Sequence, residues 1–329
     1  MKLPRRSFLQ LAAGAAALSA VSRIAGAQSY PARPITMIVP ASAGGPTDAI
    51  GRIMAERMRA SLGQTVVIEN VSGAGGSIGV GRVARAAPDG YTIGIGHWTH
   101  YVLNGAIYSL PYDLLKDFAP VAMIATGPLV IVAKKTLPAS NLEELAAWLK
   151  ANPDKALAGT GGVGTPPHVA GLLFQKTTGS RFQFVPYRGT GPAMLDLVAG
   201  QIDIMLEQAL NVIPQLRGGT IKAYAVTAKT RMASVPDVPT VDEAGLPEFH
   251  IAVWHGLWAP TGTRRDVIAR LNAAALDVLA DPAARHKLAE LGQELPPPEQ
   301  QSPEALGAYQ RGEIEKWWPI VKEAGIKPE

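Results

Sequence analysis

The stretch that decides the fold is Ile35 to Asp48, which reads ITMIVPASAGGPTD. It begins as an apolar strand and continues as a glycine-rich loop that opens a helix. Pro46 suits the first helical position, because its missing N–H would have no partner there, and Gly44 and Gly45 let bare amides approach a ligand. Free amides at the positive end of a helix favour a carboxylate or a phosphate. The stretch therefore predicts an anion site, although a tight strand-to-helix turn without a ligand would carry the same residues.

The helix that follows this loop is predicted to be amphipathic. Its apolar residues recur at helical spacing and are Ile50, Ile53, Met54, Met58 and Leu62. We therefore expect a helix that packs one face on the rest of the molecule and ends at Gly63.

The same loop chemistry returns twice, in Gly159 to His168 and in Pro186 to Ala193. Each loop follows a strand, and we expect each to open a helix at its proline. Three such loops predict a cleft lined by amide donors and hydroxyls, which implies an anionic ligand. Two roles stay open: Thr165 either caps its helix or contacts the ligand, and Arg188 either pairs with a second carboxylate or faces solvent.

Short apolar runs alternate with helical patterns along the chain. The expected strands are Ile35 to Val39, Val66 to Glu69, Thr92 to Gly96, Val121 to Ile124, Leu129 to Ala133, Ala156 to Gly159, Phe182 to Val185, Ile202 to Leu206 and Ala223 to Val226. This rhythm predicts an α/β fold with mostly parallel sheets, whose ligands lie at the carboxyl ends of the strands.

Two lobes are expected, with boundaries near Gly127-Pro128 and near Ala252 to Trp254. Residues 28–128 plus 253–329 would form lobe 1, and residues 129–252 would form lobe 2. The last part of the chain predicts a helix from about Arg264 to Ala280 and another from Ser302 to about Gly325. In that last helix we expect Trp317 and Trp318 to serve packing.

Residues 1–27 are expected to be a twin-arginine secretory signal. Arg5 and Arg6 precede a short apolar run that ends in Ala25-Gly26-Ala27, so we expect cleavage near Ala27 and a periplasmic location. The apolar run is too short for an ordinary membrane span, although a retained anchor is the alternative.

Charge and composition exclude several classes of function. The signal holds 4 of the 31 Lys and Arg and no acidic residue, so the rest has 27 basic against 27 acidic side chains and no basic bias toward nucleic acid. The chain has no cysteine, which excludes disulfides, thiolate nucleophiles and cysteine metal sites. The 6 histidines show no zinc spacing, and we expect no metal and no cofactor.

The chain resembles the extracytoplasmic solute-binding proteins of tripartite tricarboxylate transporters, the Bug family, along its mature length. The matching stretches are Pro40 to Arg52, Ser72 to Gly79, Ala87 to Thr92, Leu110 to Asp113 with Lys116 to Phe118, Gly164 to Gly171, Val185 to Gly189, Leu195 to Asp203, Asp237 to Thr240 and Glu243 to Gly245.

The resemblance implies a periplasmic binding protein fold, type II-like, with two α/β lobes that close on a small carboxylate. Two loops, Ser42 to Thr47 and Gly161 to His168, would hold one carboxylate through amides and hydroxyls. The implied protein is a monomer and not an enzyme, and it delivers a dicarboxylate, tricarboxylate or aromatic acid to membrane permease subunits. The residues expected at the ligand are Ser42, Ala43, Gly44, Gly45, Thr47, Asp48, Trp98, Thr99, His100, Gly161, Gly162, Thr165, Pro166, His168, Arg188, Gly189 and Glu207.

Two departures from the family pattern bear on the ligand. His97 to His100 stands where many relatives have small residues, and Glu207 stands where an aspartate is common. Trp98 could stack on an aromatic acid or could simply pack. These residues prevent a direct transfer of any relative's ligand.

Three rival functions fit parts of the sequence. Gly159, Gly161 and Gly164 have dinucleotide-binding spacing, but no ribose-binding acid follows about 20 residues later. Gly75 to Gly79 matches G-x-S-x-G, so a hydrolase using Ser77 is possible, although the strand before it ends several residues too early. A sensor that docks on a signalling receptor would have the same sequence features as a transport protein.

Overall fold

The computed structural model describes residues 30–327. The predicted twin-arginine signal of residues 1–27 lies outside the described residues. Within the described part, no helix is both long enough and apolar enough to cross a bilayer.

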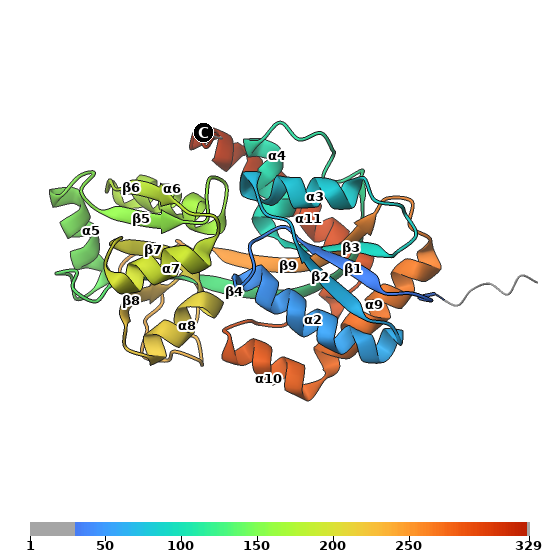
Figure 1. Cartoon of the computed structure of the whole chain (residues 1–329). Coiled ribbons are helices and arrows are strands. Elements are labelled where there is room, and N and C mark those ends of the chain that lie inside the picture. The colour runs from blue at the N-terminus through green and yellow to red at the C-terminus, as the bar shows by residue number, and fades with distance from the viewer. Residues whose placement is uncertain (1–29, 328–329) are drawn as a thin grey trace, which may run out of the picture.

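The described chain divides into two groups of elements, which occupy opposite halves of the molecule (Figure 1). One half holds β1 (Ile35–Val39), α2 (Pro46–Leu62), β2 (Val66–Asn70), η1 (Ala74–Gly76), α3 (Ser77–Ala84), β3 (Thr92–His97), η2 (Thr99–Leu103), α4 (Asn104–Ile107), α9 (Arg265–Ala280), α10 (Pro282–Glu290), η3 (Pro298–Gln300) and α11 (Pro303–Glu323). The other holds α5 (Leu142–Ala151), β5 (Leu157–Thr160), α6 (Pro166–Thr178), β6 (Gln183–Pro186), α7 (Thr190–Ala199), β7 (Ile204–Gln208), α8 (Ala209–Arg217) and β8 (Ile221–Val226). Two strands, β4 (Phe118–Lys134) and β9 (Ala252–Pro260), join the halves.

The strands form one hydrogen-bonded path in the order β2-β1-β3-β9-β4-β7-β5-β6, with β8 also paired to β4. The expectation of mostly parallel sheets is wrong. Parallel pairing holds for β1–β2, β1–β3, β5–β6 and β5–β7, whereas each described pairing that involves β4 or β9 is antiparallel. The cause is topological, because β4 and β9 cross between the halves in opposite directions.

The two expected strands Val121 to Ile124 and Leu129 to Ala133 are one continuous strand, β4, which runs through Gly127-Pro128. β4 changes partners at that point: Phe118 to Pro128 pairs with β9, whereas Leu129 onward pairs with β7 and β8. A proline cannot donate a ladder hydrogen bond. It is tolerated here because one ladder ends at Pro128 and the next begins at Leu129.

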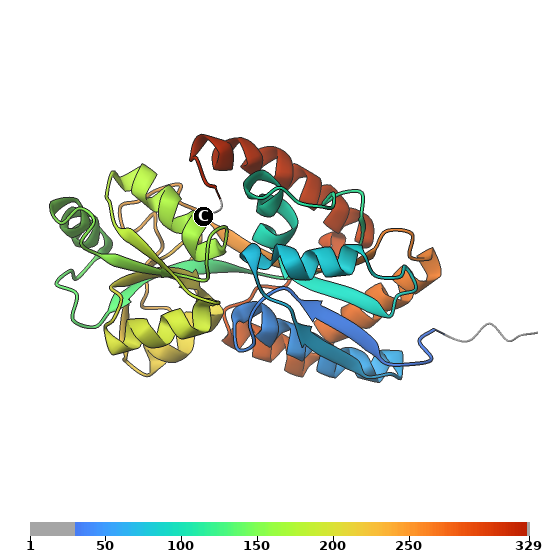
Figure 2. The same ribbon diagram turned by 45° about the horizontal axis from the view of Figure 1, so that its top comes forward.

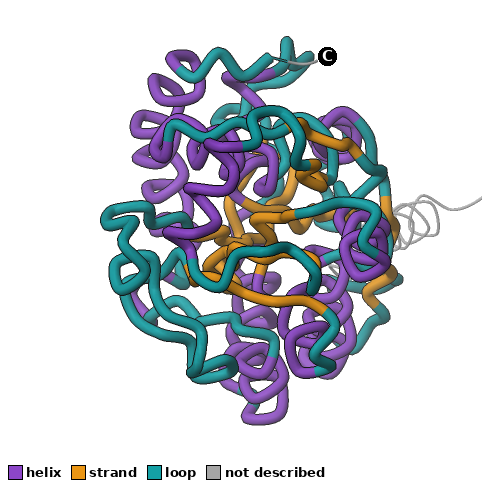
Figure 3. The backbone as a smooth tube through the Cα atoms, turned by 90° about the vertical axis from the view of Figure 1, so that its left-hand side faces the viewer, coloured by secondary structure: helices purple, strands orange, loops and turns teal. Residues whose placement is uncertain are grey.

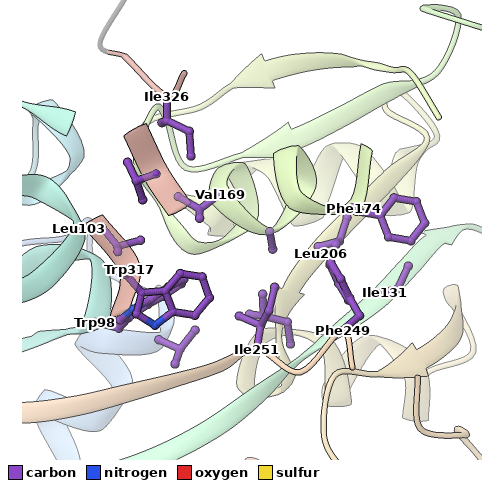
Figure 4. Close-up of a cluster of buried hydrophobic side chains, with 14 of the residues drawn as sticks. Trp98, Leu103, Ile131, Val169, Phe174, Leu206, Phe249, Ile251, Trp317 and Ile326 are labelled. Carbon is purple, nitrogen blue, oxygen red and sulfur yellow. The ribbon is translucent and has the colours of Figure 1, made fainter. Parts of the chain in front are cut away.

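Helices cover the strands on both sides, and the strands run through the interior (Figure 3). One buried cluster packs α2 and α9 against the strands of the first half, and another packs α7 and α8 in the second. A third cluster contains residues of both halves, including Trp98 and Trp317 from one and Phe174 and Leu206 from the other (Figure 4). α11 runs over this shared core toward the second half (Figure 2).

Helix boundaries follow local sequence signals in most cases. α2 begins at Pro46 and ends at Leu62, and the left-handed φ of 69° at the following Gly63 confirms the predicted stop. α6 begins at Pro166, as predicted, and the predicted Ser302 cap of α11 accepts from the Ala305 amide. The prediction for α7 is wrong: the helix begins at Thr190 and not at Pro192, so the proline lies in its first turn, where a missing N–H is tolerated.

Candidate ligand-binding site

A cavity of about 620 Å³ lies where the starts of α2, α6 and α7 converge. Its lining combines loops of both halves and consists of Pro40, Ala41, Ser42, Gly45, Pro46, Thr47, Ser72, Gly73, Ala74, Gly75, Gly76, His97, His100, Tyr108, Gly161, Gly162, Val163, Thr165, Pro166, Tyr187, Arg188, Gly189, Thr190 and Gln208. Among these lining residues Arg188 is the one with a full charge, since Asp and Glu do not occur and the histidines are neutral, as shown below. The electrostatics of the cavity therefore favour an anion.

The first loop of the lining is held in shape by Asp48. Its carboxylate accepts from the Gly44 amide at 2.9 Å, from Arg52 Nε at 2.9 Å and from Asn70 Nδ2 at 3.0 Å. Burial would raise the pKa of Asp48, but these three hydrogen bonds and the charge of Arg52 together lower the pKa below its ordinary value. Asp48 thus stays ionised and fixes the loop from behind, and it is outside the lining.

The three helices that point at the cavity lack side-chain caps. The N-cap residues Gly45 of α2 and Gly189 of α7 have no side chain to accept from the first-turn amides, and Thr165 of α6 makes no such bond either. The Thr165 hydroxyl instead donates to the Gly162 carbonyl at 2.6 Å, which closes the loop on itself. The first-turn amides of α2 and α7 therefore remain available to an acceptor from outside the protein.

Loops from the two halves touch across the cavity mouth. The Tyr108 hydroxyl donates to the Val163 carbonyl at 2.8 Å. On the other side, a Cβ added to Gly189 would lie only 1.9 Å from Ser42 Oγ, so the backbone of one loop rests directly on the side chain of the other. These contacts describe a closed arrangement in which the cavity is bounded on both sides.

The floor of the cavity is formed by the turn after β3. Gly94 and Gly96 leave room for the ring of Tyr101, which a Cβ at either position would approach within 2.6 Å. Tyr101 stacks on Trp258 with ring centroids 3.6 Å apart, and this contact holds the short π-helix η2 beneath the strand ends. The fold of η2 brings His97 and His100 together at the floor.

Three buried histidines meet at this floor. The rings of His97 and His100 stack at 3.6 Å, and His255 on the neighbouring strand β9 lies edge-on to His97 at 5.5 Å. His255 Nε2 is 3.4 Å from the Thr47 hydroxyl. Burial lowers the pKa of His100 and of His255 to about 3, and it lowers the pKa of His97 well below its ordinary value. All three rings are therefore neutral at pH 7.

Ten of the predicted site residues line the cavity, and seven do not. The ten are Ser42, Gly45, Thr47, His100, Gly161, Gly162, Thr165, Pro166, Arg188 and Gly189, and the seven are Ala43, Gly44, Asp48, Trp98, Thr99, His168 and Glu207. Arg188 is exposed at the cavity rather than directed wholly to solvent.

The stacking role considered for Trp98 is not available in this structure. Its side chain is fully buried and packs edge-on against Trp317 with ring centroids 4.6 Å apart (Figure 4). Thr99, also fully buried, donates its amide and its hydroxyl to His97 Nδ1, so it supports the floor from below. Trp317 and Trp318 are packing residues, as predicted, and the Trp318 indole donates to the Val102 carbonyl.

Glu207 and His168 also lie outside the lining. Glu207 is fully buried in β7, and burial raises the pKa of its carboxyl to about 8, so it is largely protonated at pH 7. Its neighbour Gln208 faces the cavity instead, because adjacent residues of a strand point to opposite sides. His168 Nδ1 accepts from the Gly164 amide and so braces the second loop.

Sequence reasoning missed the segment Ser72 to Gly76, His97, Tyr108 and Gln208 as lining residues. The glycines of the segment carried a signal. Gly76 has a φ of 88°, and a Cβ there would come within 2.7 Å of the Pro40 carbonyl oxygen and within 2.5 Å of His100. Only glycine fits such a position, which explains the glycine-rich stretch.

The hydrolase reading finds no support in the geometry. Ser77 is the first residue of α3, well beyond the end of β2 at Asn70, and it is not part of the cavity lining. Within residues 30–327 no group of three or more His, Asp or Glu side chains is arranged to hold a metal ion.

The chain is similar to known proteins along most of its length. Residues 50–326 match the model of the tripartite tricarboxylate transporter family receptor. The solved structure of the periplasmic binding protein BugD is 40% identical with a TM-score of 0.87, covering 91% of this chain and 100% of that one.

Two further solved structures contain bound acids. MatC from Rhodopseudomonas palustris with bound malate is 40% identical with a TM-score of 0.86, covering 89% of this chain and 100% of that one. An R. palustris protein with adipate is 32% identical with a TM-score of 0.86, covering 91% and 100%. The matched family and these neighbours are receptors and binding proteins and not enzymes, and their fold has two lobes. The chain therefore belongs to the tripartite tricarboxylate transporter receptor family of periplasmic solute-binding proteins.

Proposed function

We propose that this protein captures a small organic carboxylate in the cavity between its two halves and delivers it to the permease subunits of a tripartite tricarboxylate transporter. The observation that carries the proposal is the meeting of uncapped helix starts at a cavity with one cationic side chain and no acidic one. One carboxylate would accept from the first-turn amides of α2 and α7, with the hydroxyls of Ser42 and Thr47 beside it.

The relatives support this class of ligand. MatC is seen with malate and another R. palustris protein with adipate, and both ligands are small carboxylates. A carboxylate that accepts from the amides of loops in both halves would stabilise the closed state. Closure removes water from the site and so strengthens each hydrogen bond.

The division into lobes and the cellular role belong to the same proposal. Lobe 1 would comprise residues 28–128 plus 253–329 and lobe 2 residues 129–252, with both crossings carried by β4 and β9. The protein would be exported by the twin-arginine route, cleaved near Ala27, and act as a monomer in the periplasm. Native mass spectrometry of the exported protein tests cleavage and oligomeric state together.

Calorimetric titration with a panel of monocarboxylates, dicarboxylates, tricarboxylates and aromatic acids tests the binding function. Gly45→Leu is the informative variant, because Gly45 has a φ of −86° and its Cβ would meet only the Ser42 carbonyl at 3.5 Å. The fold should tolerate this side chain, which would project into the cavity and abolish binding. Unchanged affinity together with an unchanged melting temperature would contradict the site assignment.

A further inference from the structure

We infer that His97 and His100 are specificity-determining residues, whose ε N–H groups bind a second carboxylate at the far end of the ligand. The inference rests on the proposed function and deepens it. It assigns a subsite to two residues of the cavity floor and predicts a preference for dicarboxylates over monocarboxylates of equal length.

The tautomer of His100 follows from its neighbours. The backbone amide of His97 donates to His100 Nδ1 at 3.3 Å. An amide nitrogen can only donate, so Nδ1 must carry a lone pair. In a neutral imidazole the proton is then on Nε2. His100 Nε2 would lie 2.5 Å from a Cβ on Gly76, so it borders a glycine that lines the same cavity.

The same argument applies to His97. The backbone amide of Thr99 donates to His97 Nδ1 at 3.2 Å, so this ring also carries its proton on Nε2. The Thr99 hydroxyl lies 3.1 Å from the same nitrogen. In the described part of the chain neither ε nitrogen has a hydrogen-bond partner of its own, and both rings line the cavity. Two N–H donors are thus left for a ligand.

The floor offers these donors without a charge. Both rings stay neutral at pH 7, because burial strongly disfavours their charged forms. A neutral N–H group can donate a hydrogen bond to an oxygen of the ligand. A methyl group in the same place would leave the two N–H groups unpaired when the cavity closes. Gln208 adds an amide at the same lining, and Arg188 supplies the one positive charge. A second carboxylate offers acceptor oxygens to the two histidine N–H groups, whereas an alkyl end offers none.

The subsite is also well supported from behind. His255 packs edge-on against His97 and lies beside the Thr47 hydroxyl, which links the floor to the first turn of α2. The floor is therefore positioned relative to the proposed seat of the first carboxylate by packed side chains. A ligand with two carboxylates would bridge these two sets of donors.

Paired acids of equal chain length provide the test: succinate against butyrate, and adipate against hexanoate, titrated calorimetrically into the wild-type protein and its variants. We expect whichever dicarboxylate binds more tightly to have at least tenfold higher affinity than the monocarboxylate of the same chain length. A hydrogen bond to a charged group corresponds to roughly tenfold to hundredfold in affinity. In His100→Phe this ratio should fall by roughly tenfold, because the variant lacks one of the two donors. In His100→Gln, which keeps a donor near the Nε2 position, most of the preference should return.

His286→Gln serves as the control, because His286 is an exposed residue of α10 far from the lining. A dicarboxylate preference that is undiminished in His100→Phe, or equal binding of both acids by the wild type, would overturn the inference while leaving carboxylate binding intact. Failure of the wild type to bind any acid would instead overturn the proposed function. If His100→Phe does not fold, nitrogen-15 spectra of the wild-type histidines decide the matter. They should show two ε-protonated rings that shift with succinate and not with butyrate, and the absence of such a shift would refute the subsite.

Discussion

Replacing Gly189 with alanine should weaken ligand binding without unfolding the protein. Gly189 has a φ of 110° and rests against Ser42 Oγ, which its new Cβ would approach to 1.9 Å. Contacts of this kind need about 3.4 Å or more. The Ser42 hydroxyl must therefore turn to another rotamer, and because Ser42 Cβ at 3.1 Å is also too close for ordinary contact, the two loops must move apart slightly, so the closed arrangement is the state that loses free energy.

Gly189→Ala has two effects on free energy: backbone strain at the positive φ and the contact with Ser42. Backbone strain at an unusual positive φ costs about 1–3 kcal/mol, and it is present whether the halves are open or closed. The clash exists only in the closed state, so it acts on binding alone. A loss of about 1.4–2.8 kcal/mol in closure corresponds to roughly tenfold to hundredfold weaker affinity.

Calorimetry with the tightest-binding acid, combined with thermal denaturation, separates the two causes. Gly191→Ala is the matched control in the same helix start, because its Cβ would meet nothing within 4 Å. The double variant Gly189→Ala with Ser42→Ala removes the 1.9 Å contact and leaves the nearest Ser42 atom at 3.1 Å. Gly189→Ala should weaken binding less in the Ser42→Ala protein than in the wild type, whereas it should lower the melting temperature by a similar amount in both. Affinity of Gly189→Ala within threefold of Gly191→Ala would refute the reasoning.

Three further predictions concern pH and the loop anchor. The free energy of unfolding should fall between pH 7 and pH 5, since His97, His100 and His255 stay neutral when folded and take up protons near pH 6.5 only when unfolded, which costs about 2 kcal/mol each for His100 and His255; urea denaturation at both values measures it, and no fall would count against the neutral floor. Glu207 has the opposite effect, because its pKa is raised to about 8 in the folded protein: its contribution to stability is fully present below about pH 4.5 and is lost as the pH rises to about 8. The stability of Glu207→Gln relative to the wild type should therefore be greater at pH 9 than at pH 5. Asp48→Ala should lower stability by about 2–4 kcal/mol and weaken binding, because it frees the Gly44 amide and two side chains; a stable variant with wild-type affinity would show that the anchor is dispensable.

The loops of the site could be predicted from sequence because their chemistry is local. Gly44-Gly45-Pro46 and Thr165-Pro166 specify a turn, a helix start and open amides within a few residues, and the structure brings both to one cavity. The start of α7 was misplaced by two residues because Gly189, with its positive φ, ends the loop before Pro192 is reached.

The floor could not be predicted because its parts come together only through long-range pairing. His97 pairs with His255 across the antiparallel β3–β9 ladder, and the sequence suggested neither the ladder nor its register. Trp98 was misjudged for a related reason: the π-helix that follows it turns the indole into the shared core and the imidazole of His100 toward the cavity.

The joined course of β4 and β9 has a consequence for how the ligand departs. The ladder between the two strands runs from Phe118–Pro260 to Pro128–Ala252 and ends where the crossing between the halves begins, so the two connections lie side by side at that point. Two adjacent connections favour hinge bending between the halves, and bending separates the loops of one half from the loops of the other. A solute held by both halves then loses its contacts with one of them as the hinge opens, so the lifetime of the complex would be governed by bending at this crossing.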